Sequence, residues 1–143
     1  MIPSRLTAVT LGVHDLAAMK RFYQDIGWET NSKQDDFAAF PLGGAVLCLY
    51  EVALLAEEAA GSPPAPGNAF KGFTLAVNVA EREEVDSSLA AAIGAGGRLL
   101  AEPTDRDWGG RSAYFADPEA NAWEIAWLPD SEFDERGALI WPF

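Results

Sequence analysis

Apolar and polar residues alternate along four stretches of the chain, and the alternation predicts strands with two different faces. The stretches are 6–13, 45–50, 71–77 and 122–127. Successive side chains of a strand point to opposite faces, so odd and even positions separate. The odd positions carry large apolar side chains, and we expect this face to form the core. The odd set is Val9, Leu11, Val13, Leu47, Leu49, Phe73, Leu75, Val77, Trp123, Ile125 and Trp127.

The even positions of the same strands carry small or polar residues, such as Gly12 and Ala76. Small side chains leave volume on a curved sheet, and we expect a ligand to use that volume. Flat aromatic walls with a few polar groups suit a planar aromatic or a cationic ligand. The predicted ligand pocket comprises Thr10, Cys48, Tyr50, Thr74, Trp108, Ser112, Tyr114 and Glu124.

A helix is predicted after the first strand of each half of the chain. In the first half, Asp15 caps a segment with apolar residues on one face. In the second half, a stripe over 85–93 (Val85, Leu89, Ala92 and Ile93) has the same spacing. Further strands are predicted at 37–40 and 111–116, with shorter strands near 28–31 and 98–101.

The pattern therefore predicts a βαβββ unit in each half of the chain. We predict an α+β fold in which these two tandem units form a curved mixed sheet around a pocket. A stretch with three prolines and two glycines separates the halves. We predict a single domain over 1–143, with module one at 5–55, a linker at 56–69, module two at 70–129 and a C-terminal tail at 130–143.

Composition narrows the classes of partner. The 143 residues include 10 basic and 22 acidic residues, which gives a net charge of −12. This charge repels nucleic acid and anionic membranes and attracts cations, although we favour a simple solubilising role. The single cysteine excludes an internal disulfide framework. With no signal peptide or membrane-spanning run predicted, we expect a cytoplasmic protein.

Glu124 is the residue most suggestive of chemistry. It lies between Ala122 and Ala126 on the even face of a predicted central strand, where an unpaired carboxylate is costly. It could bind a metal, meet a cationic ligand group, or act as an acid or base with a raised pKa. Alternatively, an arginine such as Arg111, or a water molecule, donates a hydrogen bond to the Glu124 carboxylate and satisfies it.

Three segments resemble the vicinal oxygen chelate superfamily, which includes glyoxalase I, extradiol dioxygenases, and fosfomycin- and bleomycin-resistance proteins. These segments are 13–16 (VHDL), 22–28 (FYQDIGW) and 114–125 (YFADPEANAWEI). The resemblance covers nearly the whole chain and implies the doubled βαβββ fold. It also implies a homodimer, because family members commonly form dimers in which paired sheets complete the pockets.

Catalytic members of this family bind a divalent metal through four strand positions, and the resemblance places these positions at Ala8, Cys48, Gly72 and Glu124. Only Glu124 is a normal ligand for such metals, and a lone Cys–Glu pair is a poor site. We therefore expect no cofactor, and a divalent metal is the disfavoured alternative. The only histidine, His14, follows the first strand beyond the body of the sheet, and we do not expect it to be a ligand.

The resemblance, together with the lack of normal metal ligands at three of the four family positions, favours a small-molecule-binding protein similar to the bleomycin-resistance branch. The alternative is a lyase or dioxygenase-type enzyme with an altered metal site, or metal-free acid–base catalysis through Glu124. A purely structural or partner-binding module is the third reading. The apolar end of the tail, Leu139 to Phe143, is expected to dock on the domain or on a second subunit.

Overall fold

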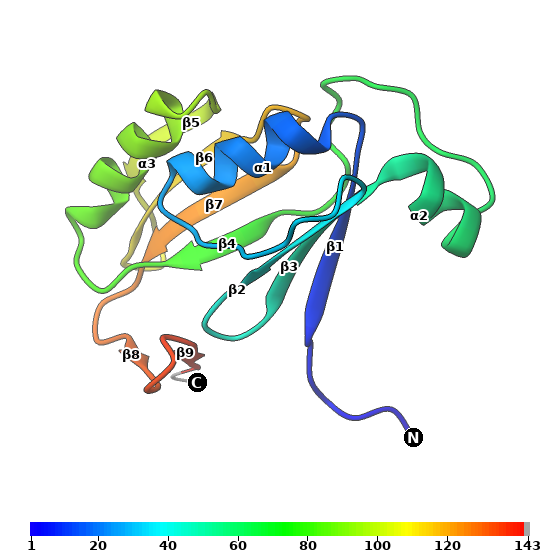
Figure 1. Ribbon diagram of the computed structural model, residues 1–143. Coiled ribbons are helices and arrows are strands. Elements are labelled where there is room, and N and C mark those ends of the chain that lie inside the picture. Colours follow the sequence, from blue (N-terminus) through cyan, green and yellow to red (C-terminus); the bar gives the residue numbers. More distant parts are fainter. Residues whose placement is uncertain (142–143) are drawn as a thin grey trace. The chain divides into compact units, whose positions relative to one another are not determined.

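The computed structural model describes residues 1–141, which contain three helices and nine strands (Figure 1). The chain forms two compact units. The first comprises residues 1–66 with 135–138, and the second comprises residues 67–134 with those from 139 on. In each unit a mixed sheet is packed against at least one helix, which confirms the predicted α+β class.

The first unit is built on a three-stranded sheet. Its strand order is β1 (Ala8–Val13), β3 (Val46–Glu51) and β2 (Phe37–Pro41), with β1 parallel and β2 antiparallel to β3. Helix α1 (Leu16–Asp25) follows β1. As predicted, Asp15 caps this helix: its carboxylate accepts a hydrogen bond of 3.0 Å from the backbone N–H of Ala18.

Helix α1 packs against β2 and β3 through Met19, Phe22 and Tyr23, all of which are buried. The Tyr23 ring stacks on Trp28 at 5.4 Å and lies 5.8 Å from the Phe40 ring. This aromatic layer fixes the helix over the apolar face of the sheet. The buried strand residues on that face are Leu11, Val13, Ala38, Phe40, Leu47 and Leu49.

The strand predicted near 28–31 is not formed, and this prediction was wrong. Side chains of the segment contact β2 instead. The Thr30 hydroxyl donates to the carbonyl of Ala39 at 2.5 Å, and the N–H of Ala39 donates to Ser32 Oγ at 2.9 Å. These side-chain bonds occupy backbone groups that a fourth strand would use, so the first unit has three strands where four were expected.

Helix α2 (Val52–Ala59) was not predicted, and it extends into the residues assigned to the linker. The Glu51 carboxylate caps it by accepting hydrogen bonds from the backbone N–H groups of Ala53 at 3.3 Å and Leu54 at 3.2 Å. The helix packs on β1 and β3. A Cβ atom at Gly12 would lie 2.9 Å from Val52 Cγ2, so the missing side chain makes room for this helix.

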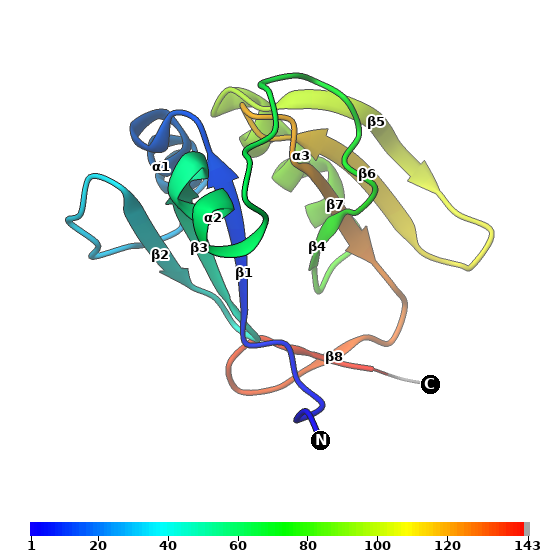
Figure 2. The same ribbon diagram turned by 90° about the vertical axis from the view of Figure 1, so that its right-hand side faces the viewer.

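The second unit is built on a four-stranded sheet, visible in Figure 2. Its order is β4 (Leu75–Asn78), β7 (Ala122–Trp127), β6 (Arg111–Ala116) and β5 (Arg98–Asp105). Strand β4 runs parallel to β7, and the other pairs are antiparallel. The predicted βαβββ pattern is thus complete in this half.

Helix α3 (Glu84–Gly94) covers one face of this sheet by packing on β5, β6 and β7. Three members of the predicted stripe, Val85, Leu89 and Ala92, are buried. The fourth, Ile93, is 39% exposed, so the apolar stripe is narrower than predicted.

Strand β4 begins later than the predicted strand at 71–77. Gly72 has a φ of +86°, which a strand residue does not adopt, and Phe73 is 43% exposed rather than in the core. Lys71 holds this stretch on the turn between β6 and β7. Its Nζ donates to the carbonyl of Glu119 at 3.0 Å and to Asn121 Oδ1 at 2.9 Å.

The C-terminal tail forms a short hairpin of β8 (Glu132–Phe133) and β9 (Leu139–Ile140). Trp141 is 66% exposed, and docking of the tail remains a prediction. Pro142 and Phe143, which were included in that prediction, lie outside the described residues. Within residues 1–141, no helix has the length and apolar character needed to cross a bilayer.

Candidate functional site

Glu124 lies on β7 directly opposite Tyr114 on β6. The Tyr114 hydroxyl donates a hydrogen bond to Glu124 Oε2. Both side chains are half-buried. Facing positions on neighbouring antiparallel strands bring side chains of one face together, so the pairing follows from the register of the two strands.

Arg111, the arginine expected to satisfy Glu124, pairs elsewhere, and that alternative was wrong. Its guanidinium donates to Asp86 at 2.8 and 2.9 Å and to Asp105 at 3.0 Å. Arg111 and Tyr114 are three residues apart on one strand, so their side chains point to opposite faces. Arg111 therefore lies on the α3 side of the sheet, while Glu124 and Tyr114 share the other side.

The Tyr114 phenol keeps its proton at neutral pH. Its hydrogen bond to Glu124 raises its pKa above the ordinary value, and burial and the carboxylate charge act in the same direction. The nearby Arg106 charge opposes this shift. Tyr114 therefore acts as a fixed hydrogen-bond donor to Glu124.

Arg106 is a site residue that the sequence analysis missed. Its Cζ lies 5.9 Å from the centre of the Tyr114 ring, and its Nε donates to Ser112 Oγ at 2.7 Å. Ser112 is only 1% exposed, so the hydroxyl is a buried anchor for the guanidinium. The available signal was the position of Arg106 in a short loop between two antiparallel strands, since such a loop folds back over its own hairpin.

The loop also positions Trp108. The N–H of Arg106 donates to the carbonyl of Gly110 at 2.8 Å, and the N–H of Gly109 donates to the carbonyl of Arg106 at 3.0 Å. A Cβ atom at Gly110 would lie 1.9 Å from Trp108 Cζ3, so the indole occupies the place of a side chain there. The same Cβ atom would also lie 2.2 Å from the carbonyl oxygen of Trp127, so the indole lies where β6 begins and β7 ends. Trp108 remains 52% exposed.

These residues form a row along β6, which we call the Tyr114 cluster. Its members are Arg106, Trp108, Ser112, Tyr114 and Glu124. Four of the five were predicted as pocket residues: Ser112, Tyr114 and Glu124 share one face of the sheet, and Trp108 lies close to the beginning of β6. Thr74, the other pocket residue predicted in this half, precedes β4 and is exposed.

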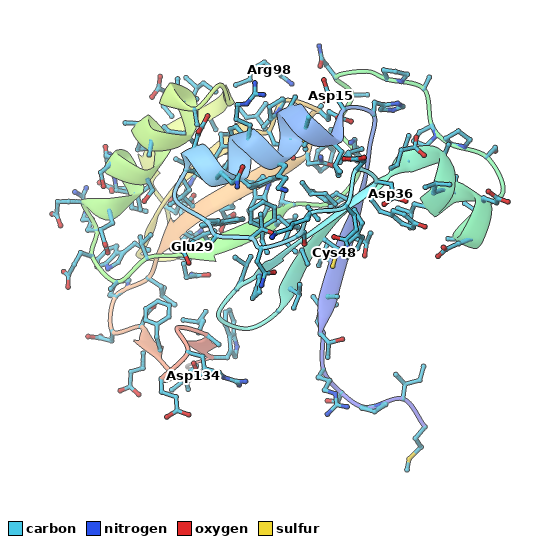
Figure 3. The ribbon with its side chains drawn as sticks, in the orientation of Figure 1. Asp15, Glu29, Asp36, Cys48, Arg98 and Asp134 are labelled. Atoms are coloured by element: carbon cyan, nitrogen blue, oxygen red, sulfur yellow. The ribbon has the colours of Figure 1, made fainter. Side chains whose placement is uncertain are left out.

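The predicted pocket residues of the first unit have different surroundings. Cys48 on β3 is buried and lies beside Thr10 on β1, which is exposed (Figure 3). The Tyr50 hydroxyl donates to Glu58 Oε1 of α2 at 3.1 Å, and this bond raises the pKa of Tyr50. The volume expected beside Gly12 is filled by Val52 of α2, so the prediction of ligand space there was wrong.

The four family metal positions do not fit a divalent cation. Ala8 and Gly72 have no donor side chain, and Gly72 lies outside β4. Glu124 Oε2 already accepts a hydrogen bond from Tyr114. Over residues 1–141, no group of three or more His, Cys, Asp or Glu side chains is arranged to hold a metal ion.

A separate hollow lies on the first unit, lined by Glu29, Thr30, Asn31 and Pro41. Three of these residues belong to the segment that was predicted as a strand, and Glu29 is labelled in Figure 3. The Thr30 hydroxyl donates to the carbonyl of Ala39, so the Glu29 carboxylate and the Asn31 amide are the other polar side-chain groups of the hollow.

Comparison with known proteins identifies the family. Residues 5–125 match the model of the Glyoxalase/Bleomycin resistance protein/Dioxygenase superfamily. A glyoxalase-related enzyme from Fulvimarina pelagi is similar in structure, with a TM-score of 0.86 and 29% identity over 96% of this chain and 98% of that chain. A glyoxalase/bleomycin resistance protein/dioxygenase family enzyme from Burkholderia phytofirmans PsJN has a TM-score of 0.74 and 25% identity over 87% and 99% of the two chains.

Lactoylglutathione lyase from Agrobacterium tumefaciens shares the fold, with a TM-score of 0.68 and 23% identity over 88% of this chain and 95% of that chain. No curated protein matches. The family match spans most of the sequence and confirms the resemblance found in its motifs. The chain belongs to the glyoxalase/bleomycin resistance protein/dioxygenase superfamily.

Proposed function

We propose that this protein binds a small organic molecule at the Tyr114 cluster, and that the ligand carries an aromatic or a cationic group. The superfamily includes both binding proteins and enzymes, so the function has to be argued from the residues of the site. The observation that carries the proposal is the hydrogen bond between Tyr114 and Glu124, with the exposed ring of Trp108 close to the beginning of β6.

Each part of the cluster supports binding of this kind. Glu124 is half-buried, and Tyr114 orients its carboxylate without neutralising it. A cationic ligand group gains from such a carboxylate, and the net charge of −12 attracts cations from a distance. The exposed Trp108 indole offers a flat surface for an aromatic ring. Since two of the four metal positions, Ala8 and Gly72, lack a donor side chain, the proposal relies on protein side chains alone.

A thermal-shift screen tests the proposal. Purified protein is screened against a panel of cationic and aromatic compounds, and we expect binders to raise the melting temperature. Glu124→Gln and Tyr114→Phe should reduce the shift of cationic binders. Glu102→Gln, which removes an exposed carboxylate outside the cluster, is the matched control and should leave the shift unchanged.

Two results would contradict binding at this site. One is a panel in which no compound raises the melting temperature. The other is a binder whose shift is equal in the wild type and in Glu124→Gln, which would place its site elsewhere.

The second candidate function is metal-free acid–base catalysis through Glu124. The Tyr114–Glu124 hydrogen bond favours it, because it places a proton donor and a proton acceptor side by side. Mass spectrometry of each binder after incubation with the protein separates the two functions. Catalysis requires a changed product that is lost in Glu124→Gln, whereas a binding protein returns the compound unchanged.

A homodimer is a further proposal from the family resemblance. The exposed Trp141 and Ile140 in the tail provide apolar surface for such a contact. Sedimentation of the full-length chain tests this, and a monomer at all concentrations would contradict it.

A further inference from the structure

Groups of opposite charge lie on either side of Tyr114. The Arg106 guanidinium is over the ring, with Cζ 5.9 Å from its centre, and the Glu124 carboxylate is at the hydroxyl. Among the described residues, no salt bridge joins Arg106 to Glu124. One face of the second sheet therefore presents a cation and an anion that do not neutralise each other.

Both charged groups are oriented, yet both keep hydrogen-bonding capacity. A guanidinium has five N–H donors. Within residues 1–141, the side-chain hydrogen bond of Arg106 uses only Nε, which donates to the buried Ser112 hydroxyl. A carboxylate accepts about four hydrogen bonds. Within residues 1–141, the hydrogen bond that the Glu124 carboxylate accepts comes from the Tyr114 hydroxyl. Neutral partners thus hold both groups and leave their outer atoms for a ligand.

Two other arginines of this unit form ion pairs, whereas Arg98 of β5 is simply exposed. Arg111 pairs with Asp86 and Asp105, and Arg82 pairs with Asp105, so their charges are used within the unit. Arg106 instead lies half-buried beside an aromatic ring and a hydroxyl. A half-buried charge without an ionic partner gains more from a charged ligand than an already paired one.

We infer that the Tyr114 cluster recognises a zwitterion, a small molecule that carries an ammonium group and a carboxylate on one aromatic body. This inference rests on the proposed function and names its ligand class. The ammonium group pairs with Glu124 and the carboxylate with Arg106. The Trp108 indole, next along the same row, contacts the aromatic body. A ligand with one charge satisfies only one of the two protein groups.

Three matched compounds test the inference by titration calorimetry on the full chain. L-Phenylalanine carries both charges, phenethylamine lacks the carboxylate, and 3-phenylpropionate lacks the ammonium group. We expect L-phenylalanine to bind about tenfold or more tightly than either single-charge compound, since each charge-assisted hydrogen bond contributes at least that factor.

Two variants assign the charges. Glu124→Gln should weaken L-phenylalanine and phenethylamine but leave 3-phenylpropionate unchanged. Arg106→Gln should weaken L-phenylalanine and 3-phenylpropionate but leave phenethylamine unchanged, and Arg106→Lys should recover part of the loss. Arg98→Gln and Glu102→Gln make the same charge changes at exposed positions of β5 and serve as controls. Circular dichroism checks that each variant is folded.

The outcomes separate the inference from the proposed function. If phenethylamine binds as tightly as L-phenylalanine, or Arg106→Gln has no effect, the zwitterion is excluded and the binding function stands. The same conclusion holds if none of the three compounds binds while other panel compounds do. If no compound from the trio or the panel binds, both are overturned.

Discussion

On the first sheet, the even face at Gly12 is covered by α2 of the same unit, whereas on the second sheet the even face presents Tyr114 and Glu124 half-exposed. The two halves share the same alternation of apolar and small residues. In the first half, the space beside a small residue admits Val52. In the second half, the corresponding face carries an ordered set of charged and aromatic groups. A repeated pattern thus gives two similar sheets, but the proposed chemistry lies on only one of them.

The helices of the two units are also held differently. Helix α1 packs with Met19, Phe22 and Tyr23, and its aromatic rings fill the space above the sheet. Helix α3 buries smaller side chains, and Asp86 on this helix forms an ion pair with Arg111 of β6 at 2.8 Å. The first helix therefore depends on apolar packing, and the second adds electrostatic contacts at the surface.

The largest expected effect compares one leucine from the odd face of each sheet. Leu49 is fully buried, and Leu49→Ala should lower the free energy of unfolding by about 3–5 kcal/mol through lost burial and a cavity. Leu75 occupies an equivalent odd position but is only partly buried, so Leu75→Ala should cost less than about 2 kcal/mol. Urea denaturation measures both, and equal costs would contradict the difference in burial.

The next effect concerns the even face of the first sheet. Gly12→Val should destabilise the protein by about 1–3 kcal/mol, because the new side chain collides with Val52 and Leu55 of α2. Gly67→Val is the matched control, since no atom lies within 4 Å of a Cβ atom there. Ala76→Val adds bulk to the exposed even face of the second sheet and should cost less than about 0.5 kcal/mol. A tolerated Gly12→Val would show that α2 does not need this space.

The smallest effect tests the ion pairs beneath α3. Arg111 lowers the pKa of Asp86 and of Asp105 in the folded protein, so both carboxylates stabilise the fold when ionised. This stabilisation is complete above the unfolded pKa of about 4 and is lost as the pH falls through the lower folded values. Arg111→Met should therefore lower the melting temperature at pH 7 and by less at pH 2.

The effect at Arg111 should be modest, because Asp86 and Asp105 are 51% and 65% exposed and water screens their charges. Arg98→Met is the control, an exposed arginine for which the structure records no ion pair within residues 1–141. A difference between wild type and Arg111→Met that stays constant with pH would assign the role of Arg111 to packing.

Local signals were sufficient to predict much of the fold. The side-chain oxygen of Asp15 and the apolar spacing behind it predicted α1, because a helix start depends on neighbours a few residues apart. Alternation predicted the buried side of β1, because it follows from the geometry of a single strand, but Cys48 of β3 and Ala122 and Ala126 of β7 are buried on the even side as well. The motif at 114–125 indicated the family, and it also contains two members of the Tyr114 cluster.

Contacts between distant segments decided the remainder. The sequence placed Glu124 on a face but could not say whether Arg111 or Tyr114 would pair with it, since that depends on the register of β6 and β7. It offered only a weak signal for Arg106, its place in a short loop between two strands, and the role of this residue arises when the loop folds back onto Ser112. By itself the sequence determined the repeated α+β units and the side of β1, β3 and β7 that carries the large apolar residues. The tertiary structure decided which even residues stay half-exposed, because only packed helices and paired strands determine what covers a side chain.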